Sequence, residues 1–581
     1  MLRYSISLPV LAVSCAKTTI SRTAYVMLWV RNAGRTAGSM ASTPHLYRVF
    51  TKVQRIITAR HRGGDGSAYR VDIATACGTR TRTLKTIRCQ LLKGPDRIRK
   101  FLVELVSGDF LAIVYHVTDL TSDGRGVART EEGRVVFLAG AMPGDRVLAA
   151  LEAQGTKGPL TGRVREILVP SPDRREHPCP HYAEGCPASP LGVLEDRAER
   201  DWKRHHLLET LVRMGPWVER DAPPGTPGAP RLSDEEQRTR NEERERLRAR
   251  LDGMTGATLP SLASLHYRDR IEPRLEPLQG GWRMLYGKGE VDVALADCLL
   301  ASVAIREAMQ ALSVRLKEGM LKPDPSFSRR SVRLLLRSNG REQAVAVLFV
   351  MTGRKFDPAP YVQWLRDIPA LAGWQVRMAR QVKTRMTHST ILAEAGDTGI
   401  MIRVGTQSLQ APPTIFTQAN ESMRDRLVEV ALDDVVTGGN LLDLYGGYGS
   451  FGLEYVRRGG RATVVDTAPD ALAAGWQFAR EHDLEVDFIE ADLARRFPRR
   501  LALETRDAVL LDPPRGGAGR NVLKVLDAHG PGRLVYVSCH PATLARDLGR
   551  LPAYRLVRLT PVDMFPQTPD LETVAVLQRD R

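Results

Sequence analysis

The chain has 581 residues, 26% charged and 43% hydrophobic, which is typical of a globular protein of about three or four domains. The net charge of +17 is uneven, because residues 1–100 hold 19 Lys or Arg against three Asp. Any nucleic-acid binding by the remainder must therefore use local patches. No apolar run reaches about 18 residues, which argues against a membrane span. Seven scattered cysteines argue against a disulfide framework and favour a reducing compartment, the cytoplasm.

Residues 1–108 form a basic leader with little periodicity. Arg3 and the apolar stretch Ile6–Ala16 loosely resemble a secretory signal peptide. A transit-like tail is an alternative, and so is a start codon assigned too far upstream. We expect residues 1–108 to be a basic N-terminal extension that is disordered or the product of a mis-assigned start.

Short β-prone runs separated by turns occupy residues 109–171. Runs such as Leu111–Tyr115 and Arg134–Phe137 predict a small closed β-barrel of the oligonucleotide-binding type. A barrel that only supports its neighbours is the alternative. The order His116-Val-Thr-Asp-Leu-Thr-Ser-Asp-Gly-Arg-Gly-Val-Ala-Arg129, followed by Gly140-Ala-Met-Pro-Gly-Asp-Arg-Val147, resembles the TRAM domain, an RNA-binding barrel.

Residues 172–410 are expected to form a central mixed α/β domain that binds RNA. Strand-like runs such as Val332–Leu336 and Ala344–Val350 alternate there with helical ones. Residues 221–256 are first rich in Pro and Gly and then in Arg and Glu. That composition predicts an insertion that is partly disordered and partly a solvated helix.

Three cysteines of this region are candidate metal ligands. Cys179 and Cys186 stand close together, and Cys298 follows much later. Thiolates bind zinc and iron–sulfur clusters, and His177 or His181 would complete a zinc site. The spacing alone does not distinguish these metals.

From residue 411 onward, strand and helix patterns alternate regularly. The predicted strands are Leu441–Tyr445, Ala462–Val465, Val486–Glu490, Ala508–Leu511 and Leu534–Val537. This alternation predicts that residues 411–581 form a doubly wound, Rossmann-like α/β sheet.

A glycine loop follows the first of these strands. Gly447, Gly449 and Gly452 fit the pattern G-x-G-x-x-G, and Asp466 ends the next strand, so a nicotinamide dinucleotide is one interpretation. S-adenosylmethionine explains more, because acidic residues close several successive strands. Asp466 would hold the ribose hydroxyls, and Asp492 would face the adenine. Taken singly, each acid is as well explained as a helix cap or turn residue.

The last strand ends on a cysteine. Cys539 and His540 follow the apolar run, and Pro541 opens a helical pattern. Ligands of open α/β sheets bind at the carboxyl ends of the strands. Cys539 is therefore a candidate nucleophile, and the adjacent helix N-terminus is expected to lower the pKa of its thiol. An inert half-buried cysteine is the alternative.

Five motifs are specific enough to compare with known families. They are Phe416-Thr-Gln-Ala-Asn420, Asp443-Leu-Tyr-Gly-Gly-Tyr-Gly449, Leu511-Asp-Pro-Pro-Arg515, Tyr536-Val-Ser-Cys-His-Pro-Ala-Thr-Leu-Ala-Arg-Asp547 and Phe565-Pro-Gln-Thr-Pro-Asp-Leu-Glu572. With them, residues 110–581 resemble the RNA uracil-C5 methyltransferases, the bacterial 5-methyluridine enzymes for tRNA and 23S rRNA. The resemblance implies Cys539 as nucleophile, Glu572 as base and S-adenosylmethionine as methyl donor. The residues implied to bind the donor or lie beside it are Gln418, Tyr445, Gly447, Gly449, Ser450, Asp466, Asp492 and Asp512.

The implied chemistry requires both a thiol and a base. Uracil C5 is a weak nucleophile until a thiolate adds to C6, and a base must afterwards remove the C5 proton to release the thiol. The target base must also leave its stack. Desolvation in an apolar strand is expected to raise the pKa of Glu572. The alternative is a surface carboxylate on an edge strand.

Several positions depart from the family pattern. Ser189 stands where the iron–sulfur branch has a third cysteine, while Cys298 matches the fourth, so a [4Fe–4S] cluster and zinc both stay open. Gly446 replaces a common Cys, His540 a common Asn, and Asp570 a common His. None of these changes removes a residue that the chemistry requires.

The TRAM-like barrel favours the 23S rRNA branch over the tRNA branch. We expect a monomeric cytoplasmic enzyme without a membrane partner. An RNA cytosine-C5 methyltransferase is one alternative, although such enzymes usually carry Pro-Cys and Thr-Cys motifs and this chain has only Ser-Cys. A non-catalytic RNA-binding or chaperone-like protein with a vestigial methyltransferase fold is another, but the intact Cys539, Glu572 and glycine loop argue against it.

Overall fold

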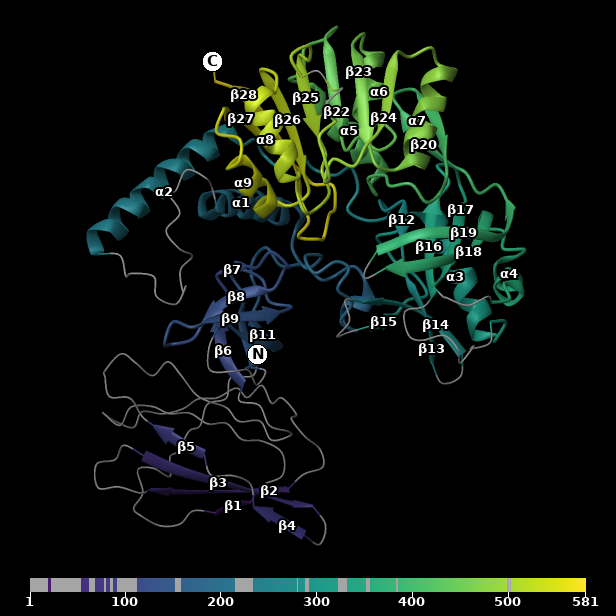
Figure 1. Ribbon diagram of the computed structural model, residues 1–581. Helices are drawn as coiled ribbons and strands as arrows, with labels where there is room; N and C mark the ends of the chain where they lie inside the picture. The colour runs from purple at the N-terminus through teal and green to yellow at the C-terminus, as the bar shows by residue number, and fades with distance from the viewer. Residues whose placement is uncertain are drawn as a thin grey trace. The chain divides into compact units, whose positions relative to one another are not determined.

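The computed structural model falls into two compact units, residues 1–121 with 125–172 and residues 122–124 with 173–581 (Figure 1). The described residues are 112–151, 158–214, 233–278, 281–287, 292–321, 332–351, 356–382, 385–498, 501 and 503–580, together with the backbone of five strands between Thr19 and Gln90. Every helix in these ranges is too short or too polar to cross a bilayer.

In the first unit, the leader contributes five strands. They are β1 (Thr19–Ser21), β2 (Gln54–His61), β3 (Ala68–Cys77), β4 (Arg80–Thr83) and β5 (Ile87–Gln90). They pair in the order β1-β2-β3-β4, and β5 also pairs with β3. The rest of residues 1–108 lies outside the described residues, so the prediction of a disordered or mis-assigned leader stays a prediction.

A second sheet of the same unit occupies the predicted barrel region. Its strands are β6 (Ala112–His116), β7 (Asp119–Leu120), β8 (Gly126–Arg129), β9 (Val135–Ala139), β10 (Arg146–Leu151) and β11 (Leu160–Val169), in the order β6-β10-β11-β9-β8-β7. Alternate residues of β9, such as Val136 and Leu138, are fully buried, as expected for strands with one face on a core. Asp145 is also fully buried, and its carboxylate accepts hydrogen bonds from Met142 N (2.7 Å) and Ser171 N (2.9 Å).

The second unit contains a central sheet with mixed strand directions. Its strands are β12 (Arg270–Ile271), β13 (Arg274–Leu278), β14 (Gly281–Gly287), β15 (Asp292–Ala294), β16 (Val332–Ser338), β17 (Ala344–Met351), β18 (Leu371–Val382) and β19 (Arg385–Gly396). They are ordered β15-β14-β13-β16-β17-β18-β19, with β12 on β16. Only β17 and β18 run parallel, and α4 (Ala359–Leu365) connects them.

The sequence of strand β17 is apolar throughout and does not alternate with polar residues. Ala346 and Leu348 belong to the core cluster that contains α3 (Val303–Lys317), whereas Val345 and Val347 belong to the cluster that contains the hairpin of β20 (Ile400–Val404) and β21 (Gln407–Ala411). Both faces of the strand are therefore buried, which favours a continuous apolar run.

The carboxyl-terminal sheet is doubly wound, as predicted. Its elements are α5 (Glu421–Leu432), β22 (Asn440–Leu444), α6 (Ser450–Arg457), β23 (Arg461–Asp466), α7 (Pro469–Glu481), β24 (Val486–Glu490), β25 (Ala508–Leu511), α8 (Arg520–His529), β26 (Arg533–Ser538), α9 (Pro541–Leu548), β27 (Tyr554–Val562) and β28 (Glu572–Arg579). The strand order is β24-β23-β22-β25-β26-β28-β27. The first five strands are parallel, and β28 runs antiparallel to both of its neighbours.

Helices cover both faces of this sheet. One core cluster joins Leu442, Val509 and Tyr536 with residues of α1 (Asp196–Met214), α8 and α9. The opposite cluster joins Leu441 and Leu510 with residues of α5 and α6. This layering leaves the carboxyl ends of the parallel strands as the place for a ligand.

The predicted insertion contains one long helix, α2 (Asp234–Met254). Ser233 and Glu236 form a capping box at its start, so the first turn is closed by the chain itself. Most of α2 is exposed, as predicted for a solvated helix, while Leu251 near its end is buried beside α1. Residues 221–232, the Pro- and Gly-rich part of the insertion for which we predicted disorder, lie outside the described residues.

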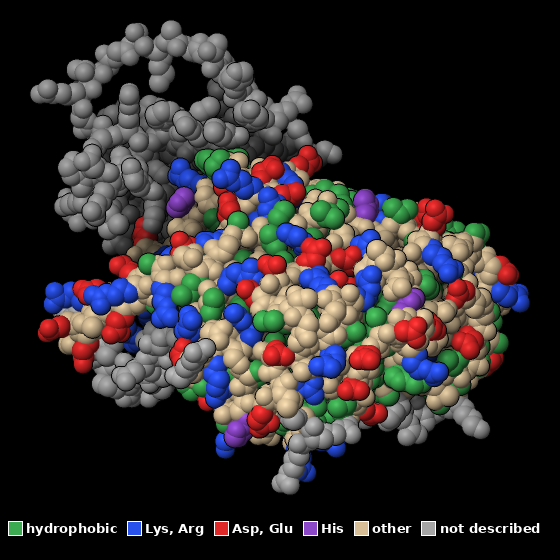
Figure 2. Space-filling view, turned by 90° about the horizontal axis from the view of Figure 1, so that it is seen from above, with side chains coloured by type: hydrophobic (Ala, Val, Ile, Leu, Met, Phe, Trp, Pro, Cys, Tyr) green, Lys and Arg blue, Asp and Glu red, His purple; other side chains and the backbone are tan. Residues whose placement is uncertain are grey.

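Charges of both signs are interspersed over the described surface in the view of Figure 2. No large area of one sign is visible on that face among the coloured residues. This distribution agrees with the near-neutral composition of the chain after the leader.

Candidate active site

The glycine loop lies where β22 ends. Tyr445 has a φ of 62°, Gly447 a φ of 59° and Gly449 a φ of 89°. Such left-handed conformations suit glycine and are uncommon for tyrosine. A Cβ on Gly446 would lie 2.7 Å from Val464 Cγ1 and 2.8 Å from the Asp443 carboxylate. In this chain the loop is thus too tight at Gly446 for the cysteine that the family commonly has there.

Asp443, in the strand before the glycine loop, binds the backbone of the helix that follows the loop. It is fully buried, and its Oδ2 accepts a hydrogen bond from Gly452 N at 3.0 Å. Burial raises the pKa of Asp443 to about 8, and the nearby carboxylates of Asp512 and Asp466 add to the rise. Asp443 is therefore a structural partner of helix α6.

The acids after β23 and β24 bind backbone N–H groups. Asp466 Oδ2 accepts from Gly447 N at 3.0 Å, and its Oδ1 accepts from Ala468 N at 2.8 Å. Asp492 Oδ1 accepts from Ala494 N at 3.0 Å. These contacts are those of turn residues, and they place the Asp466 carboxylate directly against the glycine loop. A role of Asp466 and Asp492 toward the methyl donor stays a prediction.

Asp512 and Gln418 meet at the end of β25. Burial raises the pKa of Asp512 to about 7, and a hydrogen bond from the Gln418 side chain opposes the rise. Gln418 comes from the segment before α5, far from β25 in the sequence. The structure thus joins two predicted site residues from different motifs.

Cys539 lies between β26 and α9. Burial raises the pKa of its half-buried thiol to about 12, the charges of Glu572 and Asp512 act in the same direction, and Arg515 opposes them. We predicted that the helix N-terminus lowers this pKa, but the net shift is upward, because burial and the two carboxylates disfavour the thiolate.

Glu572 is the first residue of β28 and is only 2% exposed. Strand β28 lies between β26 and β27, and the pair Ser538–Thr573 sets Glu572 beside the end of the cysteine strand. Burial raises the pKa of Glu572 well above its usual value, and Asp512 and Asp570 add to the rise. The predicted effect of desolvation is confirmed, and the alternative of an edge-strand surface carboxylate is wrong.

Two buried arginines that the sequence analysis missed hold the segment of Gln418. Arg337 on β16 donates to the carbonyls of Pro413 (3.2 Å) and Ile415 (2.9 Å). Arg424 on α5 donates to the Gln418 carbonyl at 3.0 Å. Burial lowers the pKa of Arg337 to about 10. Strand β16 holds two arginines, Arg333 and Arg337, and the sequence alone does not distinguish the buried Arg337 from its neighbour.

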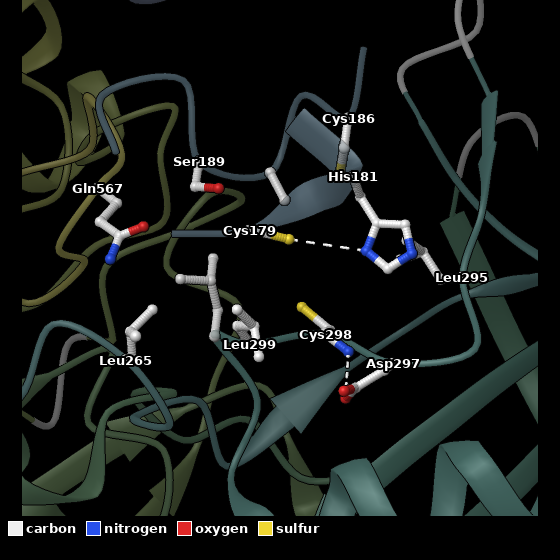
Figure 3. Close-up of a pocket in the computed structure, with 12 residues that line it drawn as sticks. Cys179, His181, Cys186, Ser189, Leu265, Leu295, Asp297, Cys298, Leu299 and Gln567 are labelled. Atoms are coloured by element: carbon white, nitrogen blue, oxygen red, sulfur yellow. Dashed lines mark hydrogen bonds between the residues drawn. The ribbon is translucent and has the colours of Figure 1, made fainter. Parts of the chain in front are cut away.

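The three candidate metal ligands line one pocket (Figure 3). The sulfur atoms of Cys179 and Cys298 point into it, and Cys179 Sγ lies 3.6 Å from His181 Nδ1. Burial raises the pKa of the Cys186 thiol and of the Cys298 thiol, because desolvation disfavours the charged thiolate.

The residues of this pocket do not fit a four-thiolate cluster. Ser189 stands where the iron–sulfur branch has its third cysteine, and its Oγ is 3.3 Å from His177 Nε2. The His177 ring is further engaged with the Ser189 carbonyl (2.9 Å) and with Cys179 N (3.0 Å), and it stacks on Tyr182 at 4.2 Å. Among the described residues, no group of three or more His, Cys, Asp or Glu is arranged to hold a metal ion.

The doubly wound sheet, the glycine loop after its first strand and the acids at the strand ends are features expected of an S-adenosylmethionine-dependent methyltransferase, and the family match supports this class over a dinucleotide enzyme. Residues 237–580 match the family described as tRNA (Uracil-5-)-methyltransferase, and residues 116–169 match the TRAM domain. The chain belongs to this uracil-C5 methyltransferase family. These matches confirm the predicted family, fold class and enzyme class.

Curated relatives extend over most of the chain. The 23S rRNA (uracil(1939)-C(5))-methyltransferase RlmD of Alkalilimnicola ehrlichii is 31% identical over 479 residues, which are 80% of this chain and 96% of the relative. An uncharacterized RNA methyltransferase of Parasynechococcus marenigrum is 28% identical over 488 residues, covering 81% and 96%.

A solved structure supports the fold. The Pyrococcus abyssi tRNA (uracil-54, C5)-methyltransferase, in complex with S-adenosyl-L-homocysteine, aligns with a TM-score of 0.57 and 23% identity. The alignment covers 80% of this chain and 100% of the archaeal chain.

Proposed function

We propose that this enzyme methylates C5 of a specific uridine in 23S rRNA, with Cys539 as nucleophile and Glu572 as base. The TRAM match and the name of the Alkalilimnicola ehrlichii relative support the ribosomal substrate. The Pyrococcus abyssi enzyme is named as a tRNA methyltransferase, so tRNA is the alternative substrate. We further propose that the enzyme is a monomer and acts in the cytoplasm.

One observation carries the assignment of the two catalytic groups. Glu572 Oε2 is buried without a hydrogen-bond partner among the described residues, and the Glu572 charge raises the pKa of the Cys539 thiol. A buried carboxyl oxygen without a partner is costly unless it has a use. Glu572 would have such a use if it removed the C5 proton of a uracil ring bound beside Cys539.

In the first step, the Cys539 thiol loses its proton to solvent and the thiolate adds to uracil C6, while the electrons of the C5–C6 double bond move toward O4 and make C5 a nucleophile. With a pKa of about 12, the resting thiol is protonated at neutral pH. The thiolate that does form is a strong nucleophile, because thiolate nucleophilicity rises with pKa. Arg515 favours this thiolate, since its guanidinium lowers the pKa of Cys539.

The second step makes the new C–C bond, and the third restores the ring. S-adenosylmethionine, when bound, supplies an electrophilic methyl group. Ionised Glu572 then takes the C5 proton, the electrons of the C5–H bond form the C5–C6 double bond, and the Cys539 thiolate leaves. The raised pKa of Glu572 makes its carboxylate a better acceptor for that proton.

We assign the methyl-donor site to the glycine loop and the strand ends around it. The proposed residues are Gln418, Tyr445, Gly447, Gly449, Ser450, Asp466, Asp492 and Asp512. The contact of Asp466 with Gly447 and that of Gln418 with Asp512 support this assignment, because each brings together two residues from different parts of the sequence. Cys179, Cys186 and Cys298 are not proposed to hold a complete [4Fe–4S] cluster.

A covalent adduct tests the catalytic assignment. Cys539→Ala should neither methylate RNA nor bind it covalently, because no group attacks C6. Glu572→Gln should allow attack and methylation and then stall, leaving an RNA–protein adduct on denaturing gels. Wild-type enzyme should form the same adduct with 5-fluorouridine RNA, because fluorine does not leave as a cation. Cys298→Ala is the matched control and should turn over normally. Turnover by Cys539→Ala would contradict the assignment.

A further inference from the structure

A buried ion cluster connects α1 to the segment that precedes Glu572. Lys203 Nζ lies 2.7 Å from Glu199 Oε1 and 2.6 Å from Asp563 Oδ1, and it donates to the Phe565 carbonyl at 3.0 Å. The Lys203, Glu199 and Asp563 side chains are 0%, 2% and 4% exposed. All three ammonium hydrogens of Lys203 thus have acceptors.

The cluster holds the loop of residues 563–571, which joins β27 to β28. Besides the bonds to Asp563 and Phe565, Glu199 Oε1 accepts from Gln567 N at 2.7 Å. Three anchor points within five residues therefore depend on two side chains of one helix. Gln567 has a φ of 65°, a conformation that persists only where the surroundings enforce it.

Other parts of the unit complete the fixation of the same loop. Asn420 Nδ2 donates to the Met564 carbonyl at 3.0 Å, and Tyr267 Oη donates to the Pro566 carbonyl at 3.0 Å. Leu191 N donates to the Gln567 carbonyl at 3.0 Å. Gln567 also lines the cysteine pocket, where Figure 3 shows it.

Electrostatics suggest that the cluster is not there for stability alone. It sets two carboxyl groups against one ammonium, and burial raises the pKa of Glu199 to about 7. Buried ion pairs of this kind are often no more stabilising than apolar residues of similar volume, because desolvation offsets the attraction. Their best-supported benefit is a defined geometry.

The geometry at stake is that of Glu572. Val562, the residue before Asp563, pairs with Glu572 across β27 and β28. A displacement of Asp563 is therefore expected to displace Glu572 as well, both through the pairing of Val562 with Glu572 and along the loop that ends at Glu572. Cys539 follows β26 and the glycine loop follows β22, so neither belongs to the segment that the cluster holds.

We propose that Glu199, Lys203 and Asp563 form a positioning cluster for the final step of the reaction, setting Glu572 for removal of the C5 proton. This inference rests on the proposed function, in which Glu572 is the base. Loss of the cluster should spare attack and methyl transfer and slow only the release of Cys539. A displacement of about 1 Å is enough to cost about 10²-fold in rate.

The test uses Lys203→Met in the full-length enzyme with ordinary uridine RNA. Expected results are methyl transfer of one equivalent per enzyme, a steady-state rate lower by about 10²-fold, and accumulation of the RNA–protein adduct on denaturing gels. Lys203→Arg should restore part of the turnover and lower the amount of adduct, because it returns a cation to the cluster. Arg197→Met is the matched control on α1, since Arg197 is 90% exposed and its partner Asp201 lies 3.7 Å away.

A second variant covers the case in which Lys203→Met does not fold. Combining Glu199→Gln, Lys203→Met and Asp563→Asn removes all the charge at similar volume and leaves no unpaired ion. It should also stall as the adduct. The proposal is wrong if the first equivalent of methyl transfer and the steady-state rate are reduced to the same extent and no adduct accumulates. It is also wrong if neither variant folds, because the cluster is then needed for stability.

The proposed function fails separately from this inference. If wild-type enzyme forms no adduct with 5-fluorouridine RNA, the assignment of Cys539 and Glu572 is at fault. If wild-type enzyme forms that adduct and Lys203→Met turns over uridine RNA at the wild-type rate, only the positioning role is refuted.

Discussion

The raised pKa of Cys539 makes its reactivity toward a small alkylating reagent predictable. Iodoacetamide reacts with thiolates and hardly with thiols. The thiol pKa rises from 9.0 to about 12, and each unit lowers the thiolate fraction tenfold. At neutral pH, Cys539 should therefore hold roughly 10³-fold less thiolate than an ordinary cysteine. The alkylation rate should rise about tenfold per pH unit from pH 7 to pH 10.

Glu572→Gln should shift this profile in a defined direction. The Glu572 charge is the largest cause of the shift after burial. Removing it should lower the thiol pKa and accelerate alkylation by roughly tenfold. The gain should be largest at pH values where the wild-type carboxyl is ionised, since only the charged form opposes the thiolate. Arg515→Met should act oppositely, because Arg515 lowers the thiol pKa.

The assay is mass-spectrometric quantification of the alkylated Cys539 peptide over time and pH. A peptide without cysteine from the same digests serves as the internal reference for protein loss. The shape of the pH profile separates pKa from accessibility, because restricted access lowers the rate equally at all pH values. A wild-type rate that levels off below pH 9, or a Glu572→Gln profile identical to wild type, would refute the electrostatic reasoning.

Three further predictions concern the methyl donor, the leader and the cysteine pocket. Asp466→Ala should weaken S-adenosylmethionine binding by about 1.5–3 kcal/mol, the cost of a lost hydrogen bond to a buried polar group, as measured by calorimetry; no binding by folded wild-type protein would contradict the assigned site. Removal of residues 1–108 should leave a folded, active enzyme by circular dichroism and methylation assay; a folded but inactive product would make the leader an RNA-binding arm. Anaerobically purified protein should contain substoichiometric iron, and Ser189→Cys should raise the content by supplying a soft ligand; four irons per wild-type chain would show that another residue completes the site.

The sequence was sufficient to place the glycine loop, the acids and the cysteine at the ends of strands. It worked because parallel strands bury both faces, so their apolar runs end sharply at the first polar residue. Leu444 and Leu511 are fully buried, and the site residues follow directly after them. The residues at the strand ends could therefore be recognised in the sequence as the first polar residues after an apolar run.

Electrostatic properties could not be inferred in the same way. The start of α9 next to Cys539 can be recognised from the neighbouring sequence. The carboxyl groups of Asp512 and Glu572, which raise the pKa of Cys539, belong instead to the end of β25 and the start of β28. Likewise, the buried cations Arg337 and Lys203 occupy ordinary positions in their own segments. What they bind comes from residues far along the chain, such as Ile415 and Phe565.

The position of β28 has a consequence for the order of folding. It is made after β27, yet it lies between β26 and β27 and pairs with both. Until β28 emerges, β26 has an unpaired edge and β27 has no neighbour in the sheet. Non-local pairing of this kind is slow because chain entropy is lost before contacts form. Since Glu572 begins β28, the pairing of β28 with β26 and β27 also brings the proposed base to the end of the cysteine strand.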